Sequence, residues 1–288
     1  MENRLHDVLA VVALSDEGKI VLKQAVFLQK VFPFRIFVLH VIPPIKFIFL
    51  SRKVRMLKEQ ALQNLKDFLK DFFGGEIPAN VIPQVIMGKI VPTLIAQGRS
   101  DNFFFMILKR SLHQKGIPNL LVQNDMDRII AHSYCPVLSI NEDSTPEHLK
   151  NILIPIDISE STTKKLLWAS LFAKKTSAKI QIVSALKIHI DEQKSLASKN
   201  AERIKAMLLE RGISCEVEIL KASQKDQYES VLDYIETQKP DLVIIRKHNV
   251  ASKINTTIGD FSKEIIHGSA VPVFTVSQSQ SDIEEILG

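Results

Sequence analysis

Residues 151–158 read NILIPIDI and residues 7–14 read DVLAVVAL, and each is an apolar, strand-like run that precedes polar residues and a helical pattern. A second recurring pair is CPVLSI at 135–140 and VPVFTV at 271–276. The members of each pair lie about 140 residues apart, which is an ordinary domain length. The sequence therefore predicts a tandem duplication, whose function depends on what the two copies share and where they differ.

Strand-like runs rich in Val, Ile and Phe alternate with segments of helical periodicity in both copies. The expected strands are 7–13, 34–42, 80–86, 102–108 and 136–140, then 151–157, 178–186, 214–220, 240–246 and 271–276. This alternation predicts two α/β domains, 1–145 and 146–288, each a five-stranded parallel sheet covered on both faces. The polar segment 141–149 is the expected linker. Ligands of such sheets bind beyond the carboxyl ends of the strands, so the residues after strands 1 and 4 are the candidate sites.

The composition, 45% hydrophobic and 24% charged, is typical of a soluble globular protein. The net charge of +5 comes from 37 basic and 32 acidic residues that are interspersed, which argues against a nucleic-acid partner. Cys135 and Cys215 form neither a disulfide framework nor a metal-binding spacing, which favours a reducing compartment. No apolar run reaches the ~18 residues of a membrane span. We therefore expect a cytoplasmic protein without a transmembrane segment or a metal.

Longer motifs carry a family resemblance. In the second copy they are ILIPIDIS at 152–159, PDLVII at 240–245 and GDFSKEIIHGSAVPVFTV at 259–276; in the first they are LHV at 39–41, MGKIVPTLI at 87–95 and DRIIAHSYCPVLSI at 127–140. These motifs resemble the universal stress protein family in its tandem, two-domain form. The resemblance implies a doubly wound fold with the strand order 3-2-1-4-5 in each domain.

Members of this family that bind ATP share an acidic residue at the end of strand 1 and a phosphate loop after strand 4. The loop reads Gly, two residues, Gly, nine residues, Gly, then Ser or Thr. Glycines let backbone N–H groups approach the phosphate, and a helix N-terminus adds its dipole. The resemblance thus provides a pattern against which each copy can be compared.

In the second copy Asp157 matches the acidic residue, but the three glycine positions hold Arg246, Asn249 and Gly259. Asp260 follows, where a carboxylate opposes a triphosphate; the alternative is that Asp260 caps a helix at 261–267. The candidate ligand-binding residues of this copy are Asp157, Ala185, Arg246, Asn249, Gly259 and Asp260. ATP or another adenine nucleotide is possible here.

The first copy departs further from the pattern. Ala13 replaces the acidic residue, and Arg110, His113, Gln123 and Asn124 occupy the loop positions. These five residues are the candidate positions of a degenerate site. We expect that ATP binding in the manner of the family has been lost in this copy.

Arg110 and Arg246 fall at the same motif position. One interpretation is that an Asp157–Arg246 ion pair fills the space left by the nucleotide, because strands 1 and 4 are neighbours in the expected order. The other is that each arginine binds a smaller anion, such as a carboxylate or a single phosphate.

The segment 43–55, PPIKFIFLSRKVR, interleaves apolar and basic residues after strand 2. It is either a lid or a surface for a partner or an anionic membrane, or its apolar residues pack on the fold while the basic ones are solvated.

The resemblance implies a non-catalytic stress-response protein that acts through a partner or a small ligand. The alternative is a nucleotide-binding switch or slow ATPase that uses the second copy. We expect the last strands, 136–140 and 272–276, to pair as an intrachain pseudo-dimer, because an exposed edge strand needs a cover. A further homodimer is possible, and the sequence identifies no protein partner.

Overall fold

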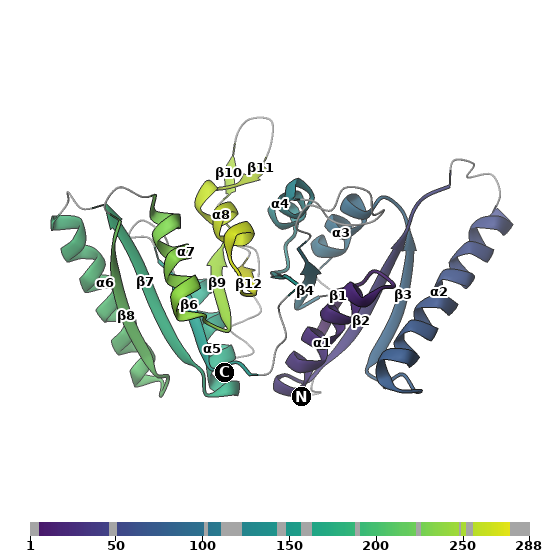
Figure 1. The fold of residues 1–288 in the computed structure, drawn as a ribbon, viewed down its shortest axis with the longest axis horizontal. Coiled ribbons are helices and arrows are strands. Elements are labelled where there is room, and N and C mark those ends of the chain that lie inside the picture. Colours follow the sequence, from purple (N-terminus) through teal and green to yellow (C-terminus); the bar gives the residue numbers. More distant parts are fainter. Residues whose placement is uncertain are drawn as a thin grey trace. The chain divides into compact units, whose positions relative to one another are not determined.

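The structure is a computed structural model that divides into two compact units, Met1–Thr145 (unit 1) and Pro146–Gly288 (unit 2). It describes residues 6–45, 51–100, 103–110, 123–142, 148–156, 163–187, 191–222, 226–247, 249–251 and 256–276. Each unit is an α/β fold built on a parallel sheet (Figure 1).

Unit 1 alternates strands and helices along its whole length. Its elements are β1 (His6–Val11), α1 (Asp16–Val31), β2 (Phe34–Ile42), α2 (Ser51–Phe73), β3 (Val81–Met87), α3 (Ile90–Arg99), β4 (Phe105–Lys109), α4 (Gln123–His132) and β5 (Val137–Ile140). The strands lie in the order β3-β2-β1-β4-β5 and pair in parallel. The predicted order 3-2-1-4-5 is confirmed.

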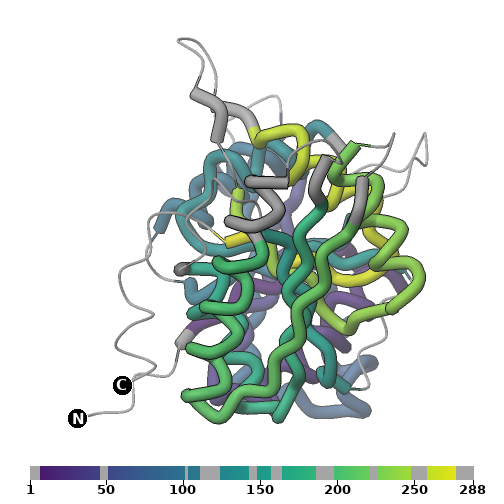
Figure 2. The backbone as a smooth tube through the Cα atoms, turned by 90° about the vertical axis from the view of Figure 1, so that its left-hand side faces the viewer, coloured from purple at the N-terminus to yellow at the C-terminus, as the bar shows by residue number. Residues whose placement is uncertain are grey.

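Unit 2 repeats this plan with one addition. Its elements are β6 (Asn151–Pro155), α5 (Thr163–Thr176), β7 (Lys179–Lys187), α6 (Asp191–Glu210), β8 (Cys215–Ala222), α7 (Gln227–Gln238), β9 (Leu242–Arg246), β10 (Asn249–Ala251), β11 (Thr256–Ile258), α8 (Asp260–Gly268) and β12 (Val273–Val276). The parallel order is β8-β7-β6-β9-β12. Figure 2 shows α6 and α7 on opposite sides of β7 and β8, as a doubly wound fold requires.

The strands β10 and β11 form a separate antiparallel ribbon, which the sequence did not predict. Each has three residues, too few for an alternating pattern to be recognised. The ribbon lies between β9 and α8, within the segment that the resemblance aligns with a phosphate loop.

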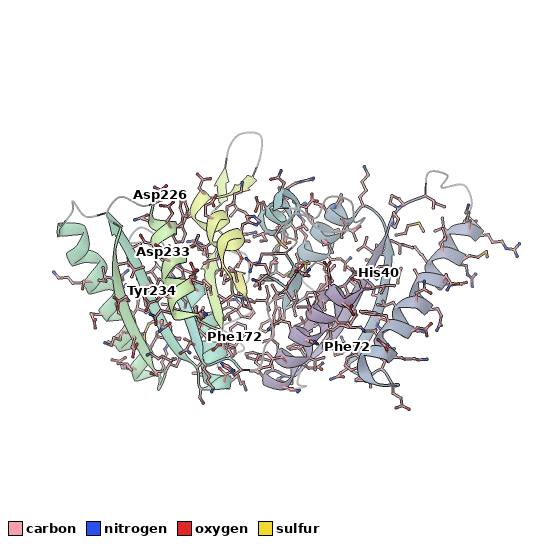
Figure 3. The ribbon with its side chains drawn as sticks, viewed as in Figure 1. His40, Phe72, Phe172, Asp226, Asp233 and Tyr234 are labelled. Atoms are coloured by element: carbon pink, nitrogen blue, oxygen red, sulfur yellow. The ribbon has the colours of Figure 1, made fainter. Side chains whose placement is uncertain are left out.

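The core of each sheet is apolar because its strands are covered on both faces. Val8, Leu9 and Ala10 of β1 are fully buried, and Phe34 packs edge to face on Phe105 with ring centroids 5.9 Å apart. In unit 2 the rings of Trp168 and Phe172 of α5 pack against Phe274 of β12, with centroids 4.7 Å and 5.4 Å from it; Phe172 is labelled in Figure 3.

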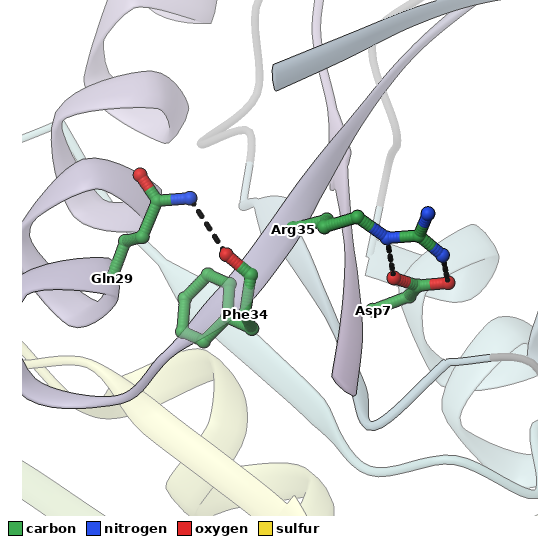
Figure 4. A network of polar contacts seen from close by, with 4 residues as sticks. All are labelled: Asp7, Gln29, Phe34 and Arg35. Carbon is green, nitrogen blue, oxygen red and sulfur yellow. Dashed lines mark hydrogen bonds and ion pairs between the residues drawn. The ribbon is translucent and has the colours of Figure 1, made fainter. Parts of the chain in front are cut away.

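An ion pair fixes the register at the amino end of β1. Asp7 and Arg35 are partners across β1 and β2, and the Arg35 guanidinium donates to both carboxylate oxygens of Asp7 at 2.7 Å and 2.8 Å. Nearby, Gln29 Nε2 donates to the Phe34 carbonyl at 2.8 Å (Figure 4). These bonds hold the end of the sheet opposite to the expected ligand edge.

Of the basic and apolar segment 43–55, residues 46–50 lie outside the described residues, and residues 51–55 form the start of α2. Arg52, Lys53 and Arg55 are exposed, as the interpretation with solvated basic residues expects. No helix in the described part of the chain is both long and apolar enough to cross a membrane.

Candidate functional site

The carboxyl ends of β1 and β4 lie side by side in unit 1, because these strands pair directly. After β1 the chain turns through Ala13 and enters α1 with Ser15 at its N-cap. Gly18 packs against this turn so closely that a Cβ atom there would lie 1.9 Å from the Ala13 carbonyl oxygen. The single glycine after β1 therefore has a packing role.

The ammonium group of Lys109 lies at this edge between two carboxylates of the chain. Lys109 Nζ is 3.0 Å from Glu17 Oε1 and 2.9 Å from Glu142 Oε1. The Lys109 side chain is 7% exposed, whereas those of Glu17 and Glu142 are 27% and 55% exposed. Charge-assisted hydrogen bonds of this length satisfy a buried ammonium group. We call these three residues the Lys109 triad.

The predicted residues of unit 1 are only partly brought together. Ala13 is half-buried beyond β1, and Arg110 is buried directly after β4. Burial lowers the pKa of the Arg110 guanidinium to about 10, so it stays charged at neutral pH. His113 lies outside the described residues, and Gln123 and Asn124 form the start of α4, where Asn124 is exposed.

The sheet register corrects the alignment of the two copies. Lys109 pairs with Ile140 in unit 1, and Arg246 pairs with Val276, the counterpart of Ile140, in unit 2. The next amides agree, because Arg110 N donates to the Ile140 carbonyl and Lys247 N to the Val276 carbonyl. The prediction that Arg110 and Arg246 share a position is therefore wrong by one residue.

What the two units share is a basic doublet at the end of the fourth strand of each sheet. It reads Lys109-Arg110 in unit 1 and Arg246-Lys247 in unit 2. Lys109, Arg110 and Lys247 are buried, and Arg246 is half-buried.

Unit 2 gathers further positive charge at the same edge. Lys165 is buried near the start of α5, and its Nζ donates to the Pro155 carbonyl at 2.9 Å. The pKa of the neighbouring Lys164 is lowered, first by burial and then by the positive charge of Arg246. The Arg246 carbonyl accepts a hydrogen bond from Ser262 Oγ at 2.9 Å, which ties the end of β9 to α8. The positive charge of Arg246 therefore disfavours the charged form of Lys164.

The acidic residue predicted for this site, Asp157, lies outside the described residues, so the Asp157–Arg246 pair stays a prediction. Asn249 is in β10, opposite Ile258. Ala185 is buried near the end of β7.

The Ala185 carbonyl accepts from Gln227 Nε2 at 2.9 Å. Gln227 is the first residue of α7, where Glu229 accepts from the amide of Asp226 at 2.9 Å; Asp226 is labelled in Figure 3. The bond from Gln227 to Ala185 therefore holds the start of α7 against the carboxyl end of β7.

The structure corrects the role predicted for Asp260. Gly259 is the N-cap of α8, with φ −63 and ψ 148, and Asp260 is the exposed first residue of the helix. Asp260 is thus not the cap, although a carboxylate in the first helical turn interacts favourably with the helix dipole. Gly259 has a negative φ, so the backbone conformation alone does not require glycine there.

The residues at this edge that sequence reasoning missed are those of the Lys109 triad. A lysine that ends an otherwise apolar strand, FMILK, is a signal that could have indicated Lys109. Its partners could not be found in this way, because Glu17 and Glu142 are distant in sequence. In the described residues, no group of three or more His, Cys, Asp or Glu side chains is placed to hold a metal ion.

Comparisons with known proteins agree with this architecture. Residues 148–277 match the universal stress protein family. A universal stress protein from Archaeoglobus fulgidus has a TM-score of 0.74 and 20% identity, over 96% of this chain and 99% of that one. A putative universal stress protein from Pseudomonas aeruginosa has a TM-score of 0.63 and 15% identity, over 99% and 96%. No curated protein matches the sequence.

A third similar structure is the cytoplasmic domain of a prokaryotic cation chloride cotransporter, with a TM-score of 0.53 and 12% identity over 98% of this chain and 99% of that domain. At such identities the likeness shows the fold, which is a tandem of two doubly wound domains. The chain carries a universal stress protein domain at 148–277, preceded by a unit of the same fold.

Proposed function

We propose that the protein is a non-catalytic stress-response protein of the universal stress protein type, in which only unit 2 binds a ligand. The first unit no longer binds a nucleotide, and the second binds a small anion or an adenine nucleotide. The observation that carries this proposal is the Lys109 triad, because it supplies unit 1 with internal counter-charges at the edge where a ligand would bind.

An incoming phosphate at unit 1 would have to displace Glu17 and Glu142 from Lys109. It would also approach two carboxylates that carry its own sign of charge, which opposes binding. The Gly18 amide already donates to the Ser15 carbonyl at 2.9 Å, so it is not available to a phosphate in this conformation. These features support a unit 1 whose role is structural.

Two basic side chains at the equivalent edge of unit 2 support ligand binding there. The positive charge of Arg246 contributes to the lowered pKa of Lys164, and an anion bound near both side chains would favour the charged form of Lys164. The helix α8 begins at Asp260, and its N-terminal amides offer donors near the end of β9. The carboxylate of Asp260 favours a small anion over a triphosphate, because it repels the larger charge.

The test is isothermal titration calorimetry of the full chain with ATP, ADP, AMP and inorganic phosphate. We expect one equivalent of ligand per chain, and we expect Arg246→Gln to abolish binding. The matched control is Lys174→Gln, which removes one exposed positive charge at the other end of α5.

Binding of two equivalents of nucleotide per chain would contradict the proposal, as would an affinity that Arg246→Gln leaves unchanged. Release of phosphate from bound ATP would favour the alternative, in which unit 2 is a slow ATPase or a nucleotide-dependent switch. Absence of binding heat with every nucleotide and with phosphate would contradict ligand binding by unit 2, and would support the interpretation that side chains of the protein occupy both sites and that it acts through a partner.

The pairing of the last strands belongs to the same proposal. In the sheet of unit 1 the order ends with β5, and in that of unit 2 with β12. A terminal strand presents unpaired backbone groups. We propose, as the sequence suggested, that residues 136–140 and 272–276 cover each other within the chain.

A further inference from the structure

The helix α2 has two halves with different surroundings. Ala61, Leu65 and Leu69, spaced four residues apart, are buried in its second half, where the helix packs on β2 and β3. In its first half every residue of 51–60 is exposed except Val54, which is half-buried. Figure 1 shows α2 lying along β3, at the end of unit 1's sheet. The first half is thus a free helical surface of unit 1.

Two large apolar side chains lie on this free half. Met56 is 61% exposed and Leu57 is 37% exposed. Among the exposed large hydrophobic residues of the described chain, no other two are adjacent in sequence. Leaving both in water costs free energy, so an adjacent exposed pair on a regular helix indicates a contact surface.

Basic side chains accompany this apolar pair at helical spacing. Arg52 precedes Met56 by four residues, and Lys53 precedes Leu57 by four, so each apolar side chain has a cationic neighbour on the same helix face. The one acidic residue of this half, Glu59, is bound by Arg55 at 2.8 Å. We call Arg52, Lys53, Met56 and Leu57 the α2 surface.

The positive charges also stand where the helix itself disfavours them. Arg52 and Lys53 are in the first turn of α2, and that turn has no acidic residue. A helix N-terminus carries a partial positive charge, so cations there are repelled. An anionic partner would offset this repulsion and the mutual repulsion of the two side chains.

We propose that the α2 surface docks on an anionic lipid membrane, with Met56 and Leu57 in the interfacial region and Arg52 and Lys53 at the lipid phosphates. A membrane interface accepts apolar and cationic groups of one helix together. The phosphate backbone of a nucleic acid would satisfy the cations but leave Met56 and Leu57 in water. This inference does not depend on the ligand site proposed above, which uses other residues.

The test is cosedimentation of the full chain with vesicles of phosphatidylglycerol mixed with phosphatidylcholine, and with vesicles of phosphatidylcholine alone. We expect binding to the anionic vesicles only, weakened by salt. The double variant Arg52→Gln, Lys53→Gln should lower the partition coefficient about thirtyfold. Met56→Gln with Leu57→Gln should lower it about tenfold. Glutamine is a good helix former, and circular dichroism checks that the fold is retained.

Matched control variants test whether vesicle binding depends on the α2 surface itself or on any exposed cation or apolar side chain. Lys174→Gln with Lys175→Gln removes two adjacent exposed cations at a helix end, and Leu209→Gln removes a more exposed leucine from α6. We expect both control variants to bind anionic vesicles as the original chain does.

Three results would overturn the proposal. One is absence of binding to anionic vesicles at low salt. Another is an equal loss of binding in the control variants. The third is that the protein does not bind vesicles but self-associates, and that Leu57→Gln abolishes the self-association. The α2 surface would then be an interface between copies of the protein.

Discussion

At the carboxyl edge of unit 1 the ammonium group of Lys109 lies against the carboxylates of Glu17 and Glu142. The equivalent strand end in unit 2 carries Arg246, beside Lys164. In unit 1, the two carboxylates compensate the charge of the nearly buried Lys109. These carboxylates belong to residues far away in sequence.

Replacing Lys109 by methionine should destabilise unit 1. The change removes both ion pairs while keeping the volume of the buried stem, and we expect the free energy of unfolding to fall by about 1–3 kcal/mol, because the two carboxylates can partly rehydrate. Chemical denaturation followed by circular dichroism measures this change.

The control is Lys19→Met, which removes the more exposed pair of Lys19 with Asp71. It should cost less than about 1 kcal/mol. If the two substitutions lowered the free energy of unfolding equally, the Lys109 triad would contribute no more to stability than the exposed ion pair does.

The charge of Arg246 should be visible in the titration of Lys164. The pKa of Lys164 lies below its ordinary value of 10.5, from burial and then from Arg246, so Arg246→Gln should raise it. Since the folded pKa is the lower one, charging Lys164 opposes folding, and this penalty disappears as pH rises through the lowered pKa toward 10.5.

NMR of the Lys164 Cε carbon against pH measures this pKa. Phosphate bound near Lys164 should also raise it, whereas Lys174→Gln should leave it unchanged. A Lys164 pKa that responds to neither Arg246→Gln nor phosphate would show that the two cations do not share a site.

At the level of elements, the strong hydrophobic periodicity of the sequence predicted all ten strands of the two parallel sheets with small errors at their ends. The expected strand 102–108 begins at Phe105 instead. β4 also ends at Lys109, which pairs with Ile140 as Arg246 pairs with Val276. Counting along a motif cannot detect where a strand ends, and Arg110 was therefore matched with Arg246 in error. The β10–β11 ribbon was missed because pairing, rather than local pattern, creates strands of three residues.

The turn from β1 into α1 depends on Gly18. Gly18→Ala should lower the free energy of unfolding by about 2–3 kcal/mol, because the new Cβ would meet the Ala13 backbone oxygen and the helix would have to shift. Gly268→Ala is the matched control, since its Cβ would meet only the end of the Leu232 side chain, which can rotate. Thermal unfolding of both variants measures the difference, and equal stabilities would show that the turn is not tightly packed.

At the scale of the whole molecule, the proposed pairing of last strands predicts the behaviour of unit 2 alone. Residues 146–288 should form a homodimer through β12, because the isolated unit would have the edge of this strand uncovered. The carbonyls of Pro272 and Val276 face β9, so the alternation of backbone groups turns the Thr275 amide toward the open edge.

Thr275→Pro removes that amide and should leave the isolated unit monomeric, since proline is tolerated in edge strands. Sedimentation velocity distinguishes the two states, and circular dichroism verifies folding. A monomer without the substitution would argue against the pairing.

The sequence by itself determined the duplication and the two parallel sheets, whereas their strand order followed from the family resemblance. The sequence could determine the sheets because burial on both faces of a sheet imposes a local, periodic pattern on the residues. Only the tertiary structure decided which charges meet at the carboxyl edge of each sheet. Folding brings together Lys109, Glu17 and Glu142. Their interaction depends on the distance between their charged groups in space, which the spacing of the residues along the chain does not determine.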